Sequence, residues 1–162
     1  MSMIGNYRRV TRAQLAELQA TPSAVPAFLY DGEPSSDAHI DLDKAWHAIH
    51  FLLNGQTWEG TGPLYDAVLG GEVLGREDVG YGPARFLTPE EVKVTATALD
   101  EVSVSDLVGR FDARQLNEND IYPQHWTGED IDLRYITDNF VRLVRFFRLA
   151  ARLDDAMLLY IN

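Results

Sequence analysis

Apolar residues recur at three- and four-residue steps between Ile40 and Gly55, which is the spacing of one face of an amphipathic helix. Asp41 stands where an N-cap carboxylate would accept hydrogen bonds from free amide groups, and Asn54-Gly55 offers a left-handed end. The pattern therefore predicts a helix over residues 42–53 that faces the core. The residues of its apolar stripe are Leu42, Ala45, Trp46, Ile49, Leu52 and Leu53.

Other helices are predicted from their start signals. Thr11 to Gln14, Thr88 to Glu91 and Ser103 to Asp106 each have the spacing of a capping box, and Thr127 to Asp130 repeats it. From about Leu133 to Leu153 apolar residues keep helical period, which predicts the longest helix of the chain. We expect about six helices in all.

Short extended runs lie between these helices and are bounded by turn-forming residues. The runs that predict four or five strands are Met3–Val10, Ala67–Leu69, Val73–Leu74, Ala84–Leu87 and Ala156–Ile161. Polar segments at residues 31–38 and 117–125 predict loops. The chain has 162 residues, which is the size of one domain. The predicted helices and strands indicate a single α/β domain over residues 1–162, in which helices cover both faces of a small mixed sheet.

Charge narrows the range of partners. The chain has 14 basic and 25 acidic side chains, a formal charge of −11, which repels nucleic-acid phosphates and anionic membranes and favours a basic protein partner. It has no cysteine, which excludes disulfides and thiolate metal sites. No signal-peptide core or membrane-length apolar run occurs, so we expect a soluble, cytoplasmic protein that binds neither nucleic acid nor membrane.

Asp43, His47 and His50 fall on one side of the predicted central helix, where a carboxylate and two imidazoles could bind a metal or exchange protons. The two histidines lack the i, i+4 spacing of a helical zinc pair, and Asp43 already has a role in the first turn. Packing or capping is therefore favoured, a pocket-lining role comes second, and we expect no metal and no cofactor. We expect both imidazoles at the rim of a concavity.

Arg85 lies on a glycine-bent segment with Tyr81. Its guanidinium could pair with a ligand carboxylate or with an internal acid, and Asp41 or Asp43 is the favoured partner. The P-loop lysine and the dinucleotide glycine spacing are absent, which argues against nucleotide binding. The candidate ligand pocket comprises His47, His50, Tyr81, Arg85, Tyr122 and Trp126.

Several segments together resemble the YfbM-like family. They are Met3 to Tyr7, Leu42 to Leu53, Gly80 to Val92, Ile121 to Pro123 with Trp126, and Leu158 to Ile161, so that the resemblance spans nearly the whole chain. The resemblance implies a three-layer α/β/α fold in a family of small bacterial proteins of unknown function. It implies no catalytic residues.

Two functions are consistent with these observations. The first is a non-enzymatic binding or regulatory protein, an immunity-type protein among them, because the chain is acidic and lacks catalytic motifs. The alternative is a small-molecule-binding protein or an unconventional enzyme that uses the His, Arg and aromatic residues of the candidate pocket. Whether the protein is an enzyme stays open at this stage.

Overall fold

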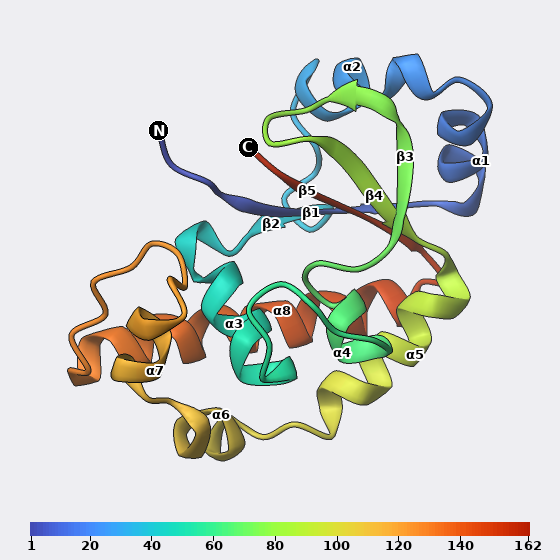
Figure 1. Cartoon of the computed structure of the whole chain (residues 1–162). Coiled ribbons are helices and arrows are strands. Elements are labelled where there is room, and N and C mark those ends of the chain that lie inside the picture. Colours follow the sequence, from blue (N-terminus) through green and yellow to red (C-terminus); the bar gives the residue numbers. More distant parts are fainter.

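A five-stranded sheet with the order β2-β1-β5-β4-β3 organises the computed structural model, which describes residues 1–162 (Figure 1). The strands are β1 Gly5–Val10, β2 His39–Asp41, β3 Glu72–Asp78, β4 Pro83–Leu87 and β5 Ala156–Ile161. Every neighbouring pair is antiparallel, so the expectation of a mixed sheet is wrong. The reason is that a short turn joins β3 to β4, and the long connection returns β5 between β1 and β4 in the opposite direction to both.

Helices cover both faces of this sheet, which confirms the expected α/β layering (Figure 1). The helices are α1 Arg12–Ala20, α2 Val25–Tyr30, α3 Trp46–Asn54, α4 Pro63–Asp66, α5 Pro89–Asp100, α6 Val104–Arg110, α7 Ala113–Glu118 and α8 Asp130–Arg152, with short 3-10 turns at Pro22–Ala24 and Asp43–Ala45. α1 and α2 lie on one face, and α3 to α8 lie on the other. None of these helices combines the length and the apolar character that a bilayer crossing requires.

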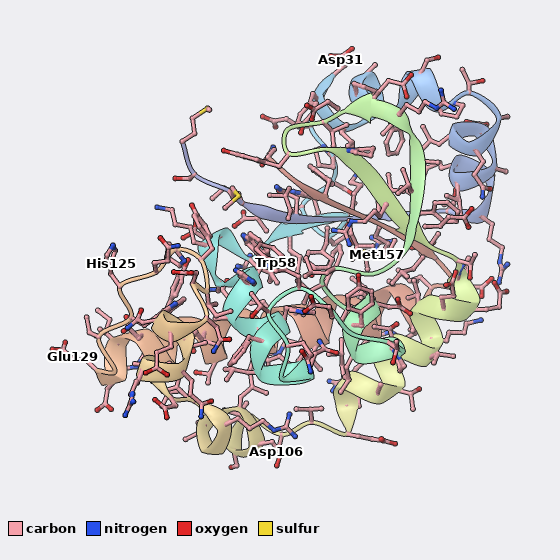
Figure 2. The ribbon with its side chains drawn as sticks, viewed as in Figure 1. Asp31, Trp58, Asp106, His125, Glu129 and Met157 are labelled. Carbon is pink, nitrogen blue, oxygen red and sulfur yellow. The ribbon has the colours of Figure 1, made fainter.

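The central strand β5 divides the hydrophobic core in two. Successive side chains of a strand point to opposite faces, so Met157 and Leu159 join the core under α3, α5 and α8 (Figure 2). Leu158 and Tyr160 join the smaller core under α1 and α2. A strand buried on both faces explains why β5 reads as a nearly continuous apolar run.

The helix starts follow the capping signals in three cases. Thr11, Thr88 and Ser103 form complete capping boxes at α1, α5 and α6. The fourth prediction, at Thr127, is wrong: Glu129 is the N-cap of α8, and the main-chain N–H and hydroxyl of Thr127 both donate to Asp132 instead.

The whole predicted stripe is buried, although Leu42 and Ala45 precede the central helix α3, and the left-handed C-cap of α3 is Gly55, with a φ of 68°. The predicted N-cap is wrong, because Asp41 belongs to β2 and its carboxylate accepts from the Asp43 N–H at 2.9 Å. A 3-10 turn at Asp43–Ala45 precedes α3. The helix therefore starts at Trp46, after the chain has left the sheet.

The structure also differs from the predicted strand at residues 67–69 and from the predicted loop at residues 117–125. Residues 67–69 form a turn after α4 and not a strand, whereas Val73 and Leu74 do lie in β3. The predicted loop at residues 117–125 begins inside α7, which ends at Glu118. The remainder of that segment is irregular as expected, and its Ile121 packs into the larger core together with Trp126, which follows the segment.

Candidate functional site

Both imidazoles of α3 are buried. His47 and His50 each have a relative exposure of 0%, so the expectation that they line the rim of a concavity is wrong. Both histidines lie in the predicted helix, but their side chains are covered by residues 56–65 and by the segment after α7, and helical periodicity carries no information about such distant contacts.

His47 is held at both ring nitrogens. Its Nε2 lies 2.8 Å from the Thr57 carbonyl oxygen, and its Nδ1 accepts from the Tyr122 main-chain N–H at 2.9 Å. Trp46 stacks on the ring at 5.0 Å between centroids, and Trp58 lies 4.2 Å away. Burial lowers the pKa of His47, while the Thr57 carbonyl group acts in the opposite direction. A neutral ring with its proton on Nε2 donates to the Thr57 carbonyl oxygen and accepts from the Tyr122 N–H. Both bonds are to main-chain groups, so the role of His47 is structural.

The ring nitrogens of His50 make weaker and fewer hydrogen bonds than those of His47. Its Nδ1 lies 3.3 Å from the Asn54 side-chain amide, and its Nε2 is buried without a hydrogen-bond partner. Burial, together with a smaller effect of the neighbouring His47, lowers the pKa of His50 to about 4, against the opposing effects of Glu59 and of the Gln56 main chain. The ring is therefore neutral near pH 7.

The predicted Asp43, His47 and His50 triplet does not assemble. The Asp43 carboxylate accepts a 2.6 Å hydrogen bond from the Tyr135 hydroxyl on α8, and its main chain has turned out of the helix. No group of three or more histidine, cysteine or acidic side chains is arranged to hold a metal ion.

Arg85 does not pair with Asp41 or Asp43, so the predicted internal ion pair is wrong. Its Nη1 donates to the carbonyl oxygens of Val68 at 3.2 Å and Gly70 at 2.6 Å. The reason is topological: β4 lies two strands from β1 and three from β2, on the far side of β5. Burial lowers the pKa of Arg85. Tyr81 is 45% exposed, and its main-chain N–H donates to Ile161.

Tyr122 and Trp126 both anchor the segment between α7 and α8. The Tyr122 hydroxyl accepts from the Met3 N–H at 2.9 Å, and its ring stacks on Trp46 at 5.9 Å. Trp126 is 7% exposed and donates its indole N–H to the Ile121 carbonyl group. Of the six predicted pocket residues, the structure thus brings His47 and Tyr122 into contact, and none of the six lines the largest hollow.

That hollow lies between the end of α3, the segment 56–64 and the end of α5, and has a volume of about 950 Å³. Its apolar floor is formed by Leu53, Leu64 and Val102, and its polar residues are Asn54, Gln56, Glu59, Thr61 and Glu101. None of these residues is among the six predicted pocket residues. Glu59 follows Trp58 in a Gly-bounded loop and Glu101 ends a helix, and only the fold brings the two segments together.

The charged residues of this hollow are both carboxylates. Glu59 and Glu101 are exposed, and neither takes part in any of the ion pairs of the protein. A second hollow, of about 390 Å³, shares Pro63, Ala98 and Glu101 and extends along α5 past Val94. We call the two together the α3–α5 hollow. Its rim also carries Lys93, which is bound to Asp154.

The fold and this hollow define an α/β protein that carries an acidic concave surface over one helical layer. The chain belongs to the family described as a domain of unknown function, DUF1877, whose model matches residues 1–160. It is 26% identical over 136 residues to "Protein YfbM" of Escherichia coli strain K12, covering 82% of this chain and 80% of that protein. The resemblance to the YfbM-like family is therefore confirmed.

The crystal structure of the Escherichia coli protein of unknown function YfbM has the same fold. It matches with a TM-score of 0.76 at 24% identity, over 98% of this chain and 99% of that one. This structural match establishes the fold, and any argument about function has to come from the residues of this chain.

Proposed function

We propose that this protein is a non-enzymatic binding protein that receives a basic segment of a partner protein in the α3–α5 hollow. The observation that carries the proposal is the chemistry of the hollow, in which two exposed carboxylates without ion partners stand over an apolar floor. Lysine and arginine combine an apolar stem with a cationic head, and this is the pattern that the floor and rim complement.

The charge of the whole chain supports the same partner class. A formal charge of −11 attracts basic proteins over a distance of about one Debye length and speeds their encounter. Trp58 (Figure 2) is next to Glu59 in the chain. It is 51% exposed, although its ring centroid lies 4.2 Å from that of His47. An exposed tryptophan next in the chain to a carboxylate of the hollow can bind a partner cation through its ring face.

The alternative function, a small-molecule site or unconventional enzyme built from the six predicted pocket residues, has less support. His47 is bound at both nitrogens by the main chain, and His50 is enclosed. Neither imidazole reaches solvent to exchange protons with a substrate.

Affinity capture with two matched double variants tests the proposal. Glu59→Gln with Glu101→Gln removes the carboxylates of the hollow, and Glu17→Gln with Glu72→Gln removes the same charge from exposed positions elsewhere. Wild-type protein immobilised in a lysate of the organism that makes it should retain a basic protein at low salt and release it as salt rises. The control variant should retain that protein, and the hollow variant should lose it.

Two results would contradict the proposal. One is that wild-type protein retains no basic protein at low ionic strength. The other is that the hollow variant and the control retain the same partner equally, since the binding surface would then lie elsewhere. Measurement of Kd for the captured protein with each variant separates a local effect of the hollow from an effect of net charge.

A further inference from the structure

The second half of α8 is basic in a protein that is otherwise acidic. Residues 141–152 include four arginines and no aspartate or glutamate, although acids outnumber bases by 25 to 14 in the whole chain. Steps of three and four residues place the arginines along one side of the helix, and all four are exposed. They are Arg142, Arg145, Arg148 and Arg152. This side of α8 therefore carries a concentration of positive charge on a chain of formal charge −11.

Three of these four guanidinium groups have no carboxylate partner. Arg148 donates to Asp100 Oδ1 at 2.6 Å, and it is the one member of the four that takes part in an ion pair. Arg142 donates to the Asp41 carbonyl oxygen and to the side-chain oxygen of Asn139. Arg145 takes part in no ion pair, so its charge is open to a partner molecule.

Arg145 and Arg148 line a groove between α8 and the junction of α5 with α6, which we call the α6–α8 groove. It has a volume of about 210 Å³. Leu99 and Phe140 are buried and form its floor, whereas Val104 is 40% exposed at its rim. The apolar lining residues are Leu99, Val102, Val104, Phe140, Val141 and Val144. The groove thus combines an apolar floor with arginines at one side.

The size of the groove indicates what it can receive. Its volume lies below the range of about 300–1,000 Å³ that is usual for small-molecule pockets, and it suits an apolar side chain of a bound peptide segment. A segment that lays one apolar face into such a groove keeps its polar residues at the rim. A carboxylate beside the inserted side chain would then meet Arg145.

The net charge of the chain does not decide the charge of this segment. At physiological ionic strength, charges separated by more than about 8 Å are largely screened, so the nearest groups dominate. The charged residues that line the groove are Asp100, Arg145 and Arg148, which together leave one net positive charge. The groove therefore complements an acidic segment, in contrast to the α3–α5 hollow, whose own charged residues complement a basic one.

We propose that the α6–α8 groove docks a short, acidic, amphipathic segment of a partner protein. An apolar side chain of the segment packs on Leu99 and Phe140, and a carboxylate of the segment pairs with Arg145. This site goes beyond the proposed function, which places a basic segment in the α3–α5 hollow. The two sites share Val102 and no charged residue, so that charge variants distinguish them and either proposal can fail without the other.

Selection of random dodecapeptides displayed on phage, with the wild-type protein as bait, tests the proposal. The expected result is a set of peptides that carry aspartate or glutamate beside leucine, isoleucine or phenylalanine. Their Kd should rise by about threefold to tenfold with Arg145→Gln. It should stay unchanged with Arg152→Gln, the matched control, which removes an exposed and unpaired arginine of the same helix outside the groove. A selection that enriches no acidic peptide, or equal Kd values for the two variants, would overturn the proposal.

An exchange of charges tests whether Arg145 itself meets the carboxylate. Each acidic residue of a selected peptide is replaced by lysine in turn, and every peptide is measured against the wild-type protein and Arg145→Glu. The variant should prefer one of the lysine peptides, whereas the wild-type protein should prefer the original, because a direct contact gives a coupling energy in a double-mutant cycle. The same order of preference in both proteins would contradict the assigned contact.

Methyl NMR spectra of the wild-type protein locate the bound peptide. During titration the methyl signals of Val104, Val141 and Val144 should shift, because these side chains line the groove. The signals of Leu53 and Leu64, which line the α3–α5 hollow, should not. Shifts confined to these two leucines would place the acidic peptide in the other site and would overturn the proposal.

Discussion

The Nδ1 atom of His47 accepts a hydrogen bond from the main-chain N–H of Tyr122, 2.9 Å away in space and 75 positions away in the chain. On the other side of the ring, Nε2 donates to the Thr57 carbonyl oxygen. One imidazole thus joins α3 to two irregular segments, and each segment would otherwise bury an unpaired main-chain group. This arrangement needs the neutral ring, because a protonated Nδ1 would face another N–H.

Replacing this ring with an apolar one should destabilise the protein. His47→Phe leaves the Thr57 carbonyl group and the Tyr122 N–H without partners, at an expected cost of about 2–4 kcal/mol in the free energy of unfolding. Urea denaturation followed by tryptophan fluorescence measures it. The control is His125→Asn, an exposed histidine on the outer loop whose φ of 61° asparagine tolerates (Figure 2). A His47→Phe variant as stable as this control would show that the two hydrogen bonds contribute nothing.

Stability should fall as the pH is lowered from about 6.5 to about 4. The pKa of His50 is lowered from 6.5 to about 4, so the unfolded chain binds a proton in that range before the folded chain does. The loss of unfolding free energy that His50 causes reaches about 3 kcal/mol once the pH falls to the pKa of His50 in the folded protein. The pKa of His47 is lowered too and acts in the same direction. Urea midpoints measured at half-unit steps between pH 7 and pH 4 test this.

His50→Leu isolates the part of this effect that belongs to His50. The substitution removes a buried Nε2 that has no partner, and the Asn54 side chain keeps its bonds to the carbonyl oxygens of His50 and Leu64. We expect a change within about 1 kcal/mol at pH 7 and a shallower loss of stability on acidification. An unchanged pH profile would assign the titration to another residue.

Gly5→Ala and Gly109→Ala should have opposite effects. At Gly5 the new methyl group would lie 2.7 Å from Trp46 Cβ, and overpacking of this kind costs about 1–3 kcal/mol. Gly109 lies inside α6 with no atom within 4 Å of the added carbon, so alanine should stabilise by about 0.5–1 kcal/mol. Calorimetric Tm values for the two variants check both signs. If Gly5→Ala leaves Tm unchanged, the Trp46 side chain can shift to make room for the added methyl group.

Loss of the α5 cap should destabilise its helix. Thr88→Ala removes the hydroxyl that accepts from the Glu91 N–H at 3.2 Å, at a cost of about 1 kcal/mol. Thr97→Ala, at an exposed position in the same helix, is the control and should be neutral or slightly stabilising because alanine has the higher helix propensity. Equal unfolding free energies for the two variants would show that the cap is not needed.

Local sequence determined several of the helix starts and strands of this protein. The capping boxes at Thr11, Thr88 and Ser103, the apolar stripe at residues 42–53 and the terminal strand at Ala156–Ile161 were predicted correctly, because each depends on residues only a few positions apart. The resemblance to a known family also lay in short segments of the sequence, and the family match confirms it.

The tertiary structure alone decided which side chains reach solvent. Periodicity placed His47 and His50 off the apolar stripe but could not show that distant segments cover that face. Strand order likewise separated Arg85 from the acids expected to pair with it, and the packing of α4 against both α3 and α5 brought Glu59 and Glu101 to one hollow. The physical reason is that burial and ion pairing depend on contacts between residues far apart in the chain, whereas helix and strand patterns depend on neighbours.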